Sequence, residues 1–212
     1  GRRPTDWERA TAALADGRWI TADMAYRRAA LRAAGGFDER FPRAFREDAE
    51  LAYRIRAAGW ELVRGARVVT HPVRPEGPWV SLRTQRGKAD DALMRRRHGP
   101  DWRKRIGAAG RFPAHLLTTA AAAGAAVSWA TGHRKLAALF GIAWAGATAE
   151  FAASRIAPGP RTTAEIRRMV ATSLLIPPAA VGWRLHGELR WMAVPRSVPR
   201  SRRHPGRGRA HA

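Results

Sequence analysis

Cysteine is absent from the 212-residue sequence, which excludes disulfide bonds, thiolate metal sites and cysteine nucleophiles. Acidic residues are scarce, because 17 Asp and Glu stand against 39 Lys and Arg, giving a formal net charge of +22 at pH 7. Lysine is also scarce, and the basic residues other than Lys88, Lys104 and Lys135 are arginines. A pI near 11.9 predicts attraction to polyanions, either nucleic acid or anionic lipid, and charge alone does not choose between them.

The few acidic residues are unevenly distributed along the chain. Five lie between Asp38 and Glu50, whereas only Glu150, Glu165 and Glu188 follow Phe112, where the sequence becomes alanine-rich. We therefore expect a folded domain over residues 1–110, a hydrophobic helical region over residues 111–190, and a basic, disordered tail over residues 191–212. Because the chain starts without a methionine or a signal-peptide pattern, we interpret it as the C-terminal part of a longer protein.

Local patterns in the first half predict alternating helices and short strands. Apolar periodicity, N-terminal capping residues and closing glycines predict helices at Pro4–Ala15, Arg27–Ala34, Glu47–Ala58 and Trp79–His98. Aromatic and β-branched runs predict strands at Trp19–Thr21, Trp60–Val63 and Arg67–Thr70.

The alanine-rich half contains three uncharged runs. Pro113–Gly132 has no formal charge over about the length needed to span a bilayer, and Leu136–Ala149 is a second such run. Pro177-Pro178 is expected to break the third run, Met169–Trp183. These runs can form a hairpin in the membrane, a pair of interfacial helices or alanine-rich soluble packing. Their basic flanks favour contact with the cytoplasmic face of a membrane.

The adjacent acids Glu47 and Asp48 permit two interpretations. Acids in the first turn of a helix are commonly solvated and interact favourably with the helix dipole. A carboxylate at a helix start can also act as a general base, and two adjacent acids raise each other's proton affinity. The surrounding residues bear on this choice.

Several segments occur in a specific order over residues 19–72: Met24-Ala25, Gly35 to Glu39, Glu47-Asp48 with Leu51 and Arg54, and Val69-Thr70-His71. This order resembles the C-terminal half of the catalytic domain of family 2 inverting glycosyltransferases, which have the GT-A fold. The resemblance implies an α/β fold class, namely the C-terminal half of a GT-A domain, and the uncharged runs after it predict an all-α, membrane-associated segment.

The same resemblance implies roles for individual residues. Asp48 would deprotonate the acceptor hydroxyl, with Glu47 beside it, during transfer from a nucleotide sugar to a glycan or lipid-linked acceptor of the cell envelope. The substrate-binding residues it implies are Gly35, Gly36, Phe37, Asp38, Glu39 and Arg54. Asp23 stands where the family more often has Asn or Cys, which leaves its contact open.

The resemblance also implies a divalent metal, Mg²⁺ or Mn²⁺, on the donor diphosphate. His71 would help to hold it, although a lone histidine is more often structural. The metal-binding Asp-x-Asp motif and the nucleotide-binding half of the fold do not occur in this sequence. We therefore expect the main metal ligands outside this chain and no full-strength donor binding by the chain alone. Gln85 does not begin a Gln-x-x-Arg-Trp motif, which favours single addition over polymer synthesis.

Two alternatives remain at this stage. The chain could be a non-catalytic protein whose arginines bind nucleic acid or anionic lipid. This explains the net charge but not the acidic cluster or the order of the motifs. A degenerate transferase-like scaffold also fits the sequence. Of these partners, nucleic acid is the least expected.

Overall fold

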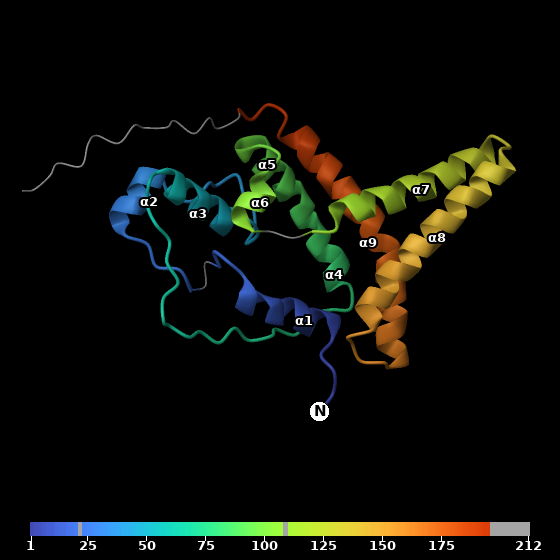
Figure 1. Ribbon diagram of the computed structural model, residues 1–212, viewed down its shortest axis with the longest axis horizontal. Helices are drawn as coiled ribbons and strands as arrows, with labels where there is room; N and C mark the ends of the chain where they lie inside the picture. Colours follow the sequence, from blue (N-terminus) through green and yellow to red (C-terminus); the bar gives the residue numbers. More distant parts are fainter. Residues whose placement is uncertain (21–22, 108–109, 196–212) are drawn as a thin grey trace, which may run out of the picture.

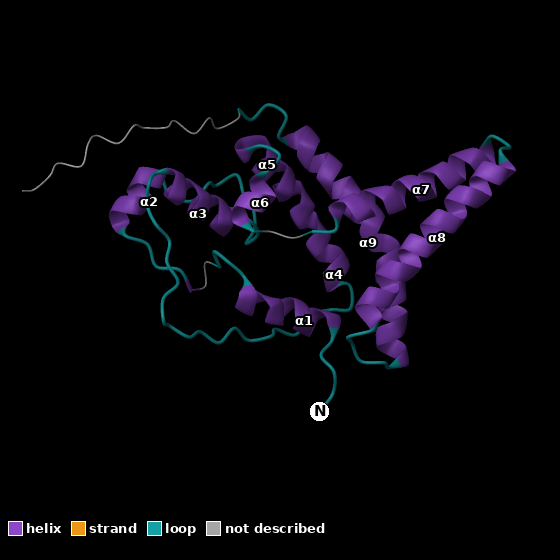
Figure 2. Cartoon of the chain, viewed as in Figure 1, coloured by secondary structure: helices purple, strands orange, loops and turns teal. Residues whose placement is uncertain are grey.

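The computed structural model describes residues 1–20, 23–107 and 110–195, and every regular element among them is helical (Figures 1 and 2). The elements in chain order are α1 (Asp6–Ala12), η1 (Ala13–Asp16), α2 (Arg28–Ala34), α3 (Glu47–Ala57), α4 (Val80–Arg83), η3 (Thr84–Gly87), α5 (Lys88–His98), α6 (Trp102–Ile106), α7 (Phe112–Ala130), α8 (Arg134–Ile156) and α9 (Thr163–Arg190). The predicted basic tail lies largely at residues 196–212, outside the described residues.

The predicted α/β fold, with half of a GT-A domain, is wrong for the described residues, which form no strand or sheet. Trp60–Val63 and Arg67–Thr70 are irregular coil, and Val63 and Val68 are 77% and 91% exposed. A strand needs a neighbour for its backbone N–H and C=O groups, and these segments have none in the part of the chain described. In the predicted strand Trp19–Thr21, Trp19 has a left-handed φ of 66°, which is not a strand conformation, and Thr21 lies outside the described residues.

The predicted helices of the first half are confirmed, because their signals are local. Thr5 caps α1, accepting a hydrogen bond from the Glu8 N–H while the Glu8 side chain accepts one from the Thr5 N–H. Helix α2 ends at Gly35, whose φ of 77° suits glycine. The predicted helix over Trp79–His98 is divided into α4, η3 and α5.

The second half is also helical, but α9 differs from the sequence prediction. It runs without interruption from Thr163 to Arg190 and includes Pro177 and Pro178, which were expected to break it. Pro177 is fully buried, so packing has overridden the local preference of proline. The predicted break is therefore wrong.

One apolar core joins early and late parts of the chain. Its buried residues are Phe41, Ala49, Ala92, Leu93, Met94, Trp102, Ile106 and Trp191. The C-terminal end of α9 reaches this core by packing closely on α5, since a Cβ at Gly187 would lie 2.5 Å from the Ala89 carbonyl oxygen. A smaller cluster, formed by Ala30, Leu51 and Ile55, joins α2 to α3. We call residues 1–107 together with α9 the body.

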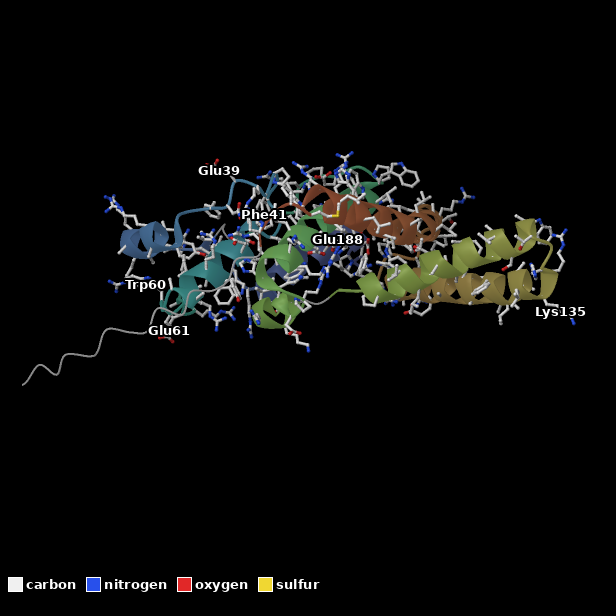
Figure 3. The ribbon with its side chains drawn as sticks, turned by 90° about the horizontal axis from the view of Figure 1, so that it is seen from above. Glu39, Phe41, Trp60, Glu61, Lys135 and Glu188 are labelled. Atoms are coloured by element: carbon white, nitrogen blue, oxygen red, sulfur yellow. The ribbon has the colours of Figure 1, made fainter. Side chains whose placement is uncertain are left out.

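Helices α7 and α8 lie side by side and project from the body as a hairpin (Figure 1). Figure 3 shows the same projection from a second direction, with Lys135 near its tip. The base of the hairpin is fixed to the body by the buried guanidinium of Arg155. Its Nη1 donates to the Thr172 and Ser173 hydroxyls at 2.7 and 3.0 Å, and its Nη2 donates to the Asp6 carboxylate at 2.8 Å.

Candidate functional site

The start of α3 is set by an unusual backbone conformation at Arg46. Its φ of 77° is left-handed, which is rare for a residue with a side chain. Three contacts hold it, because Arg46 Nε donates to Asp91 Oδ1 at 2.9 Å and its guanidinium lies 4.5 Å from the Phe45 ring and 5.2 Å from the Trp102 ring. Helix α5 thereby fixes the position at which the Glu47-Asp48 pair begins.

The carboxyl group of Glu47 has a raised pKa. Burial raises the pKa of Glu47, and the negative charge of Asp48 raises it further. Its Oε2 atom is buried and has no hydrogen-bond partner among the described residues. This carboxyl group can therefore take up a proton more readily than an ordinary glutamate.

Asp48 acts on Tyr26, a residue to which the family resemblance assigns no role. Its Oδ1 accepts a hydrogen bond from the Ala49 N–H at 2.6 Å. Burial raises the pKa of the Tyr26 phenol, and the charge of Asp48 raises it further, so the two groups are near each other. Tyr26 directly follows the Met24-Ala25 motif, and that adjacency was the signal in the sequence that could have identified it.

Glu50, one turn further along α3, is a structural carboxylate. It is fully buried, and Arg54 Nε donates to its two oxygens at 2.9 and 2.7 Å, while His98 Nε2 lies 3.0 Å from Oε1. Burial favours a higher pKa, but the hydrogen bonds from His98 and Arg54 outweigh it and lower the pKa of Glu50. Glu50 therefore stays ionised and stabilises the fold.

Arg54, predicted to bind substrate, contacts the backbone of the predicted substrate loop. Its Nη2 donates to the Gly36 carbonyl at 2.7 Å, and its Nη1 donates to the Ala34 carbonyl. Gly35 and Gly36 have φ values of 77° and 72°, which explains why both are glycine. Arg54 thus attaches the loop after α2 to the helix that carries Glu47 and Asp48.

The remaining loop residues divide into paired and exposed side chains. Asp38 accepts hydrogen bonds from Arg40 Nε and Nη2, both at 2.8 Å, and lies 3.3 Å from Arg97 Nε. These contacts outweigh the effect of burial and lower the pKa of Asp38. Phe37 and Glu39 are exposed, and Figure 3 shows Glu39 at the outer edge of the loop. Phe37 and Glu39 can therefore contact a ligand without breaking an ion pair.

His71 lies in exposed coil rather than at the end of a strand. No group of three His, Asp or Glu residues that could hold a metal ion occurs in the described part of the chain. The described residues therefore form no metal site by themselves, and the role of His71 as one ligand to a metal held mainly from outside this chain stays a prediction.

Two buried acids on α5 were missed by the sequence reasoning. Asp90 Oδ2 lies 2.6 Å from Arg43 Nη1, and Asp91 contacts Arg46 and Arg103. They connect the loop before α3 to α5 across more than forty residues. The signal was visible as adjacent aspartates in a strongly basic segment, but their partners are distant in sequence.

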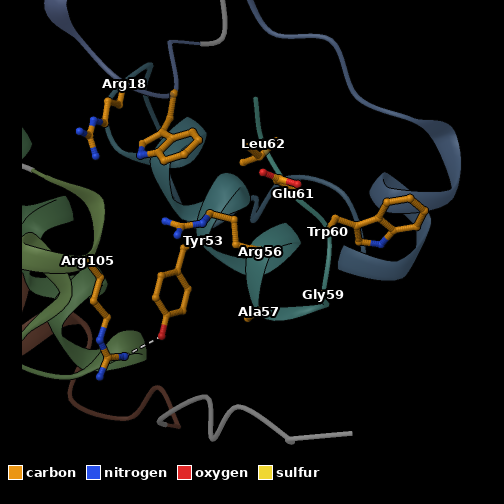
Figure 4. Close-up of a pocket in the computed structure, with 10 residues that line it drawn as sticks. Arg18, Tyr53, Arg56, Ala57, Gly59, Trp60, Glu61, Leu62 and Arg105 are labelled. Atoms are coloured by element: carbon orange, nitrogen blue, oxygen red, sulfur yellow. Dashed lines mark hydrogen bonds between the residues drawn. The ribbon is translucent and has the colours of Figure 1, made fainter. Parts of the chain in front are cut away.

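A pocket of about 740 Å³ opens beside the C-terminal half of α3 (Figure 4). Its lining includes Arg18, Arg56, Arg105, Trp19, Tyr53 and Trp60. The Tyr53 hydroxyl accepts a hydrogen bond from Arg105 Nη1 at 2.7 Å, and the Arg56 guanidinium lies 5.6 Å from the Trp19 ring. Arginines between aromatic rings suit a ligand that carries both a negative charge and a ring.

Comparisons of the chain with protein-family models, curated proteins and solved structures found no match. The resemblance to family 2 glycosyltransferases therefore rests on the motifs in residues 19–72. In the structure, Glu47 and Asp48 begin α3, and Arg54 attaches the same helix to the Gly35-Gly36 loop. The charge of Asp48 acts on Tyr26, and His71 lies in exposed coil.

Proposed function

We propose that this chain supplies the acceptor side of an inverting glycosyltransferase that acts at a membrane. The observation that carries the proposal is a contrast among the acids near α3. Glu50 and Asp38 are held as carboxylates by arginine and histidine, whereas Glu47 has a raised pKa beside Asp48. Acids that differ in this way separate structural charges from groups able to move a proton.

In the proposed reaction, Asp48 accepts the proton of an acceptor hydroxyl while the hydroxyl oxygen attacks the anomeric carbon of a nucleotide sugar. A new carbon–oxygen bond forms as the bond from the anomeric carbon to the diphosphate oxygen breaks. The nucleoside diphosphate leaves with the electron pair, and direct displacement inverts the anomeric configuration. Glu47 holds the acceptor beside Asp48 and shares the proton.

The loop after α2 would lie under the sugars. Arg54 attaches it to α3, its two glycines permit close approach of a ligand to the backbone, and Phe37 and Glu39 are exposed. A sugar ring can pack on Phe37 and donate hydroxyl hydrogen bonds to Glu39. The donor diphosphate and its metal require residues outside this chain.

The test is a transfer assay in membranes from cells that express the polypeptide containing this chain together with its donor site. Asp48→Asn keeps the shape of the side chain but removes the base, so we expect transfer to fall at least about 100-fold. Nucleotide-sugar binding is expected to remain unchanged. Asp101→Asn is a matched control, because Asp101 is exposed and its one ion pair, with Lys104 at 3.7 Å, lies on the surface among the described residues. Asp48→Asn activity equal to that of the control would remove Asp48 from the mechanism.

A second candidate function is favoured by the pocket beside α3. Three arginines and two tryptophans suit a non-catalytic site for an anionic, ring-bearing ligand. If binding were the function, Arg56→Ala would abolish ligand binding, and Asp48→Asn would have no effect.

A further inference from the structure

The α7–α8 hairpin has an inverted distribution of side chains. Most of the large apolar residues are exposed, namely Leu116, Leu117, Val127, Trp129, Leu136, Leu139 and Ile142, whereas Phe140, which is 37% exposed, and the half-buried Phe151 of α8 pack against α7. The buried residues are mostly polar: His115, Thr118, Ser128, Thr148 and Arg155, with Ala137 and Ala152. A water-soluble helical hairpin shows the opposite distribution.

Small and polar residues of α7 contact aromatic rings of α8, since His115 packs edge-on against Phe151 with 4.9 Å between the ring centroids. Gly124 faces the Phe140 ring, and a Cβ at Gly124 would lie 3.0 Å from it. Thr118 donates its hydroxyl hydrogen to the Ala114 carbonyl of its own helix at 2.9 Å, so its buried oxygen is satisfied. Small residues at the interface and internally bonded hydroxyls are typical of helices packed within lipid.

Charged residues occur only at the two ends of the hairpin. At the tip, Arg134 follows the turn and its guanidinium lies 3.8 Å from the Trp129 ring, next to Lys135. At the base, Arg111 forms an ion pair with Glu150. Glu150 follows Arg134 by sixteen positions and Thr131 follows Arg111 by twenty, so the helical rises between them are about 24 and 30 Å, against the ~30 Å hydrocarbon core of a bilayer.

This pattern distinguishes a spanning hairpin from one that lies along the membrane surface. Interfacial helices carry a charged face along their length, whereas α7 has no Lys, Arg, Asp or Glu from Phe112 to Ala130. Within the described residues, α8 is the one helix long and apolar enough to cross a membrane by itself. Only 17% of its most apolar 18-residue stretch is buried. We propose that α7 and α8 cross a lipid bilayer together, with the turn at residues 131–135 on the far side.

The basic residues also assign an orientation. Arg103, Lys104, Arg105, Arg111, Arg155, Arg161, Arg167 and Arg168 flank the base of the hairpin, whereas Arg134 and Lys135 mark the tip. The side with more Lys and Arg near the membrane stays in the cytoplasm. The body, with Glu47 and Asp48, therefore faces the cytoplasm, and this orientation does not depend on the proposed transfer reaction.

The absence of cysteine makes the test direct, because single cysteines can be placed on the full chain in bacterial inner membranes. Thr131→Cys reports the tip and Arg64→Cys reports the body, since both residues are exposed. A membrane-impermeant maleimide is expected to label Arg64→Cys only in inside-out vesicles and Thr131→Cys only in spheroplasts. Both variants should react after detergent is added, which controls for folding and access.

Two outcomes would overturn the proposal. Labelling of both cysteines from the same side would show that the hairpin does not cross the bilayer. Release of the chain by alkaline carbonate as a soluble dimer would show that a second copy covers the apolar surface. Release only by detergent, with the two cysteines on opposite sides, is the result that we expect.

Discussion

The apolar core around α5 and α6 and the hairpin bury opposite types of residue, and α9, which packs on both, has buried Thr172 and Ser173 and exposed leucines as the hairpin does. In the body, Leu93 and Trp102 are buried, and the buried acids Glu50, Asp90 and Asp91 are paired with arginines. In the hairpin, leucines and a tryptophan face outward, and threonine and serine lie inside. This difference is the basis of our proposal that the body faces water and the hairpin faces lipid.

The largest expected effect is at the joint between the two regions. Arg155→Met removes the hydrogen bonds from a buried guanidinium to Thr172 and Ser173, while the partly exposed Asp6 keeps Arg9 as a partner at 3.3 Å. Because hydrogen bonds that involve a charged group contribute about 1.5–3 kcal/mol each, we expect unfolding in detergent to become easier by about 3–5 kcal/mol. Denaturant titration followed by tryptophan fluorescence measures this loss. Arg161→Met, at an exposed position in the connection between α8 and α9, should change stability by less than about 0.5 kcal/mol.

A pair of leucine substitutions tests the comparison itself. Leu93 is 0% exposed in the body, whereas Leu139 is 62% exposed on the hairpin. Leu93→Ala is expected to destabilise the protein by about 2–5 kcal/mol, because it leaves a cavity in the core. Leu139→Ala should cost less than about 1 kcal/mol in detergent but should reduce retention in liposomes. Equal losses of stability would show that both leucines face the same environment.

Two glycines on α9 provide a smaller, matched contrast. A Cβ at Gly187 would lie 2.5 Å from the Ala89 carbonyl oxygen, whereas one at Gly182 would meet nothing within 4 Å. Gly187→Ala should therefore cost about 1–3 kcal/mol by separating α9 from α5. Gly182→Ala should raise stability slightly, since alanine favours a helix. Thermal unfolding of both variants in the same detergent makes the measurement.

The smallest expected effect is the pH dependence of Glu47. Its pKa is raised in the folded state, so the folded protein binds a proton more tightly than the unfolded chain does. Stability from this group is present below the ordinary glutamate pKa, about 4.3, and is lost as pH rises through the folded pKa. Glu47→Gln should therefore be more stable than the wild type near pH 7 and equal to it near pH 4.

Glu50 is the control for this prediction, because its pKa shifts in the opposite direction. Its lowered pKa gives stability above the ordinary glutamate pKa that is lost as pH falls. Glu50→Gln should lower stability at pH 7. Denaturation midpoints from pH 3 to pH 8 separate the two cases, and a Glu47→Gln variant that loses stability at pH 7 would contradict the role assigned to burial.

What could be predicted from the sequence was local. The caps at Thr5 and Gly35 set helix ends within a few residues, so α1, α2 and α3 were placed correctly. The strands at Trp60–Val63 and Arg67–Thr70 were wrong, because a β-prone run becomes a strand only when a distant segment pairs with it.

The candidate site divides in the same manner. Glu47 and Asp48 were identified by their position at a helix start, and Tyr26 lay next to a motif already noted. The pairing of Arg43 and Arg46 with Asp90 and Asp91 could not be predicted, because it depends on where α5 packs. Burial favours a higher pKa for both Glu47 and Glu50 in the first turn of α3, and the hydrogen bonds from the distant His98 and from Arg54 reverse the direction for Glu50.

The claim that the two regions face different solvents is tested most directly by spin labels on single cysteines in liposomes. Labels at Leu117 and Leu139 report the hairpin, and a label at the exposed Asp101 reports the body. We expect the hairpin labels to be relaxed by oxygen, which concentrates in lipid, and the Asp101 label to be relaxed by a water-soluble nickel chelate. Relaxation of all three labels by the nickel chelate would place the hairpin in water and contradict the account.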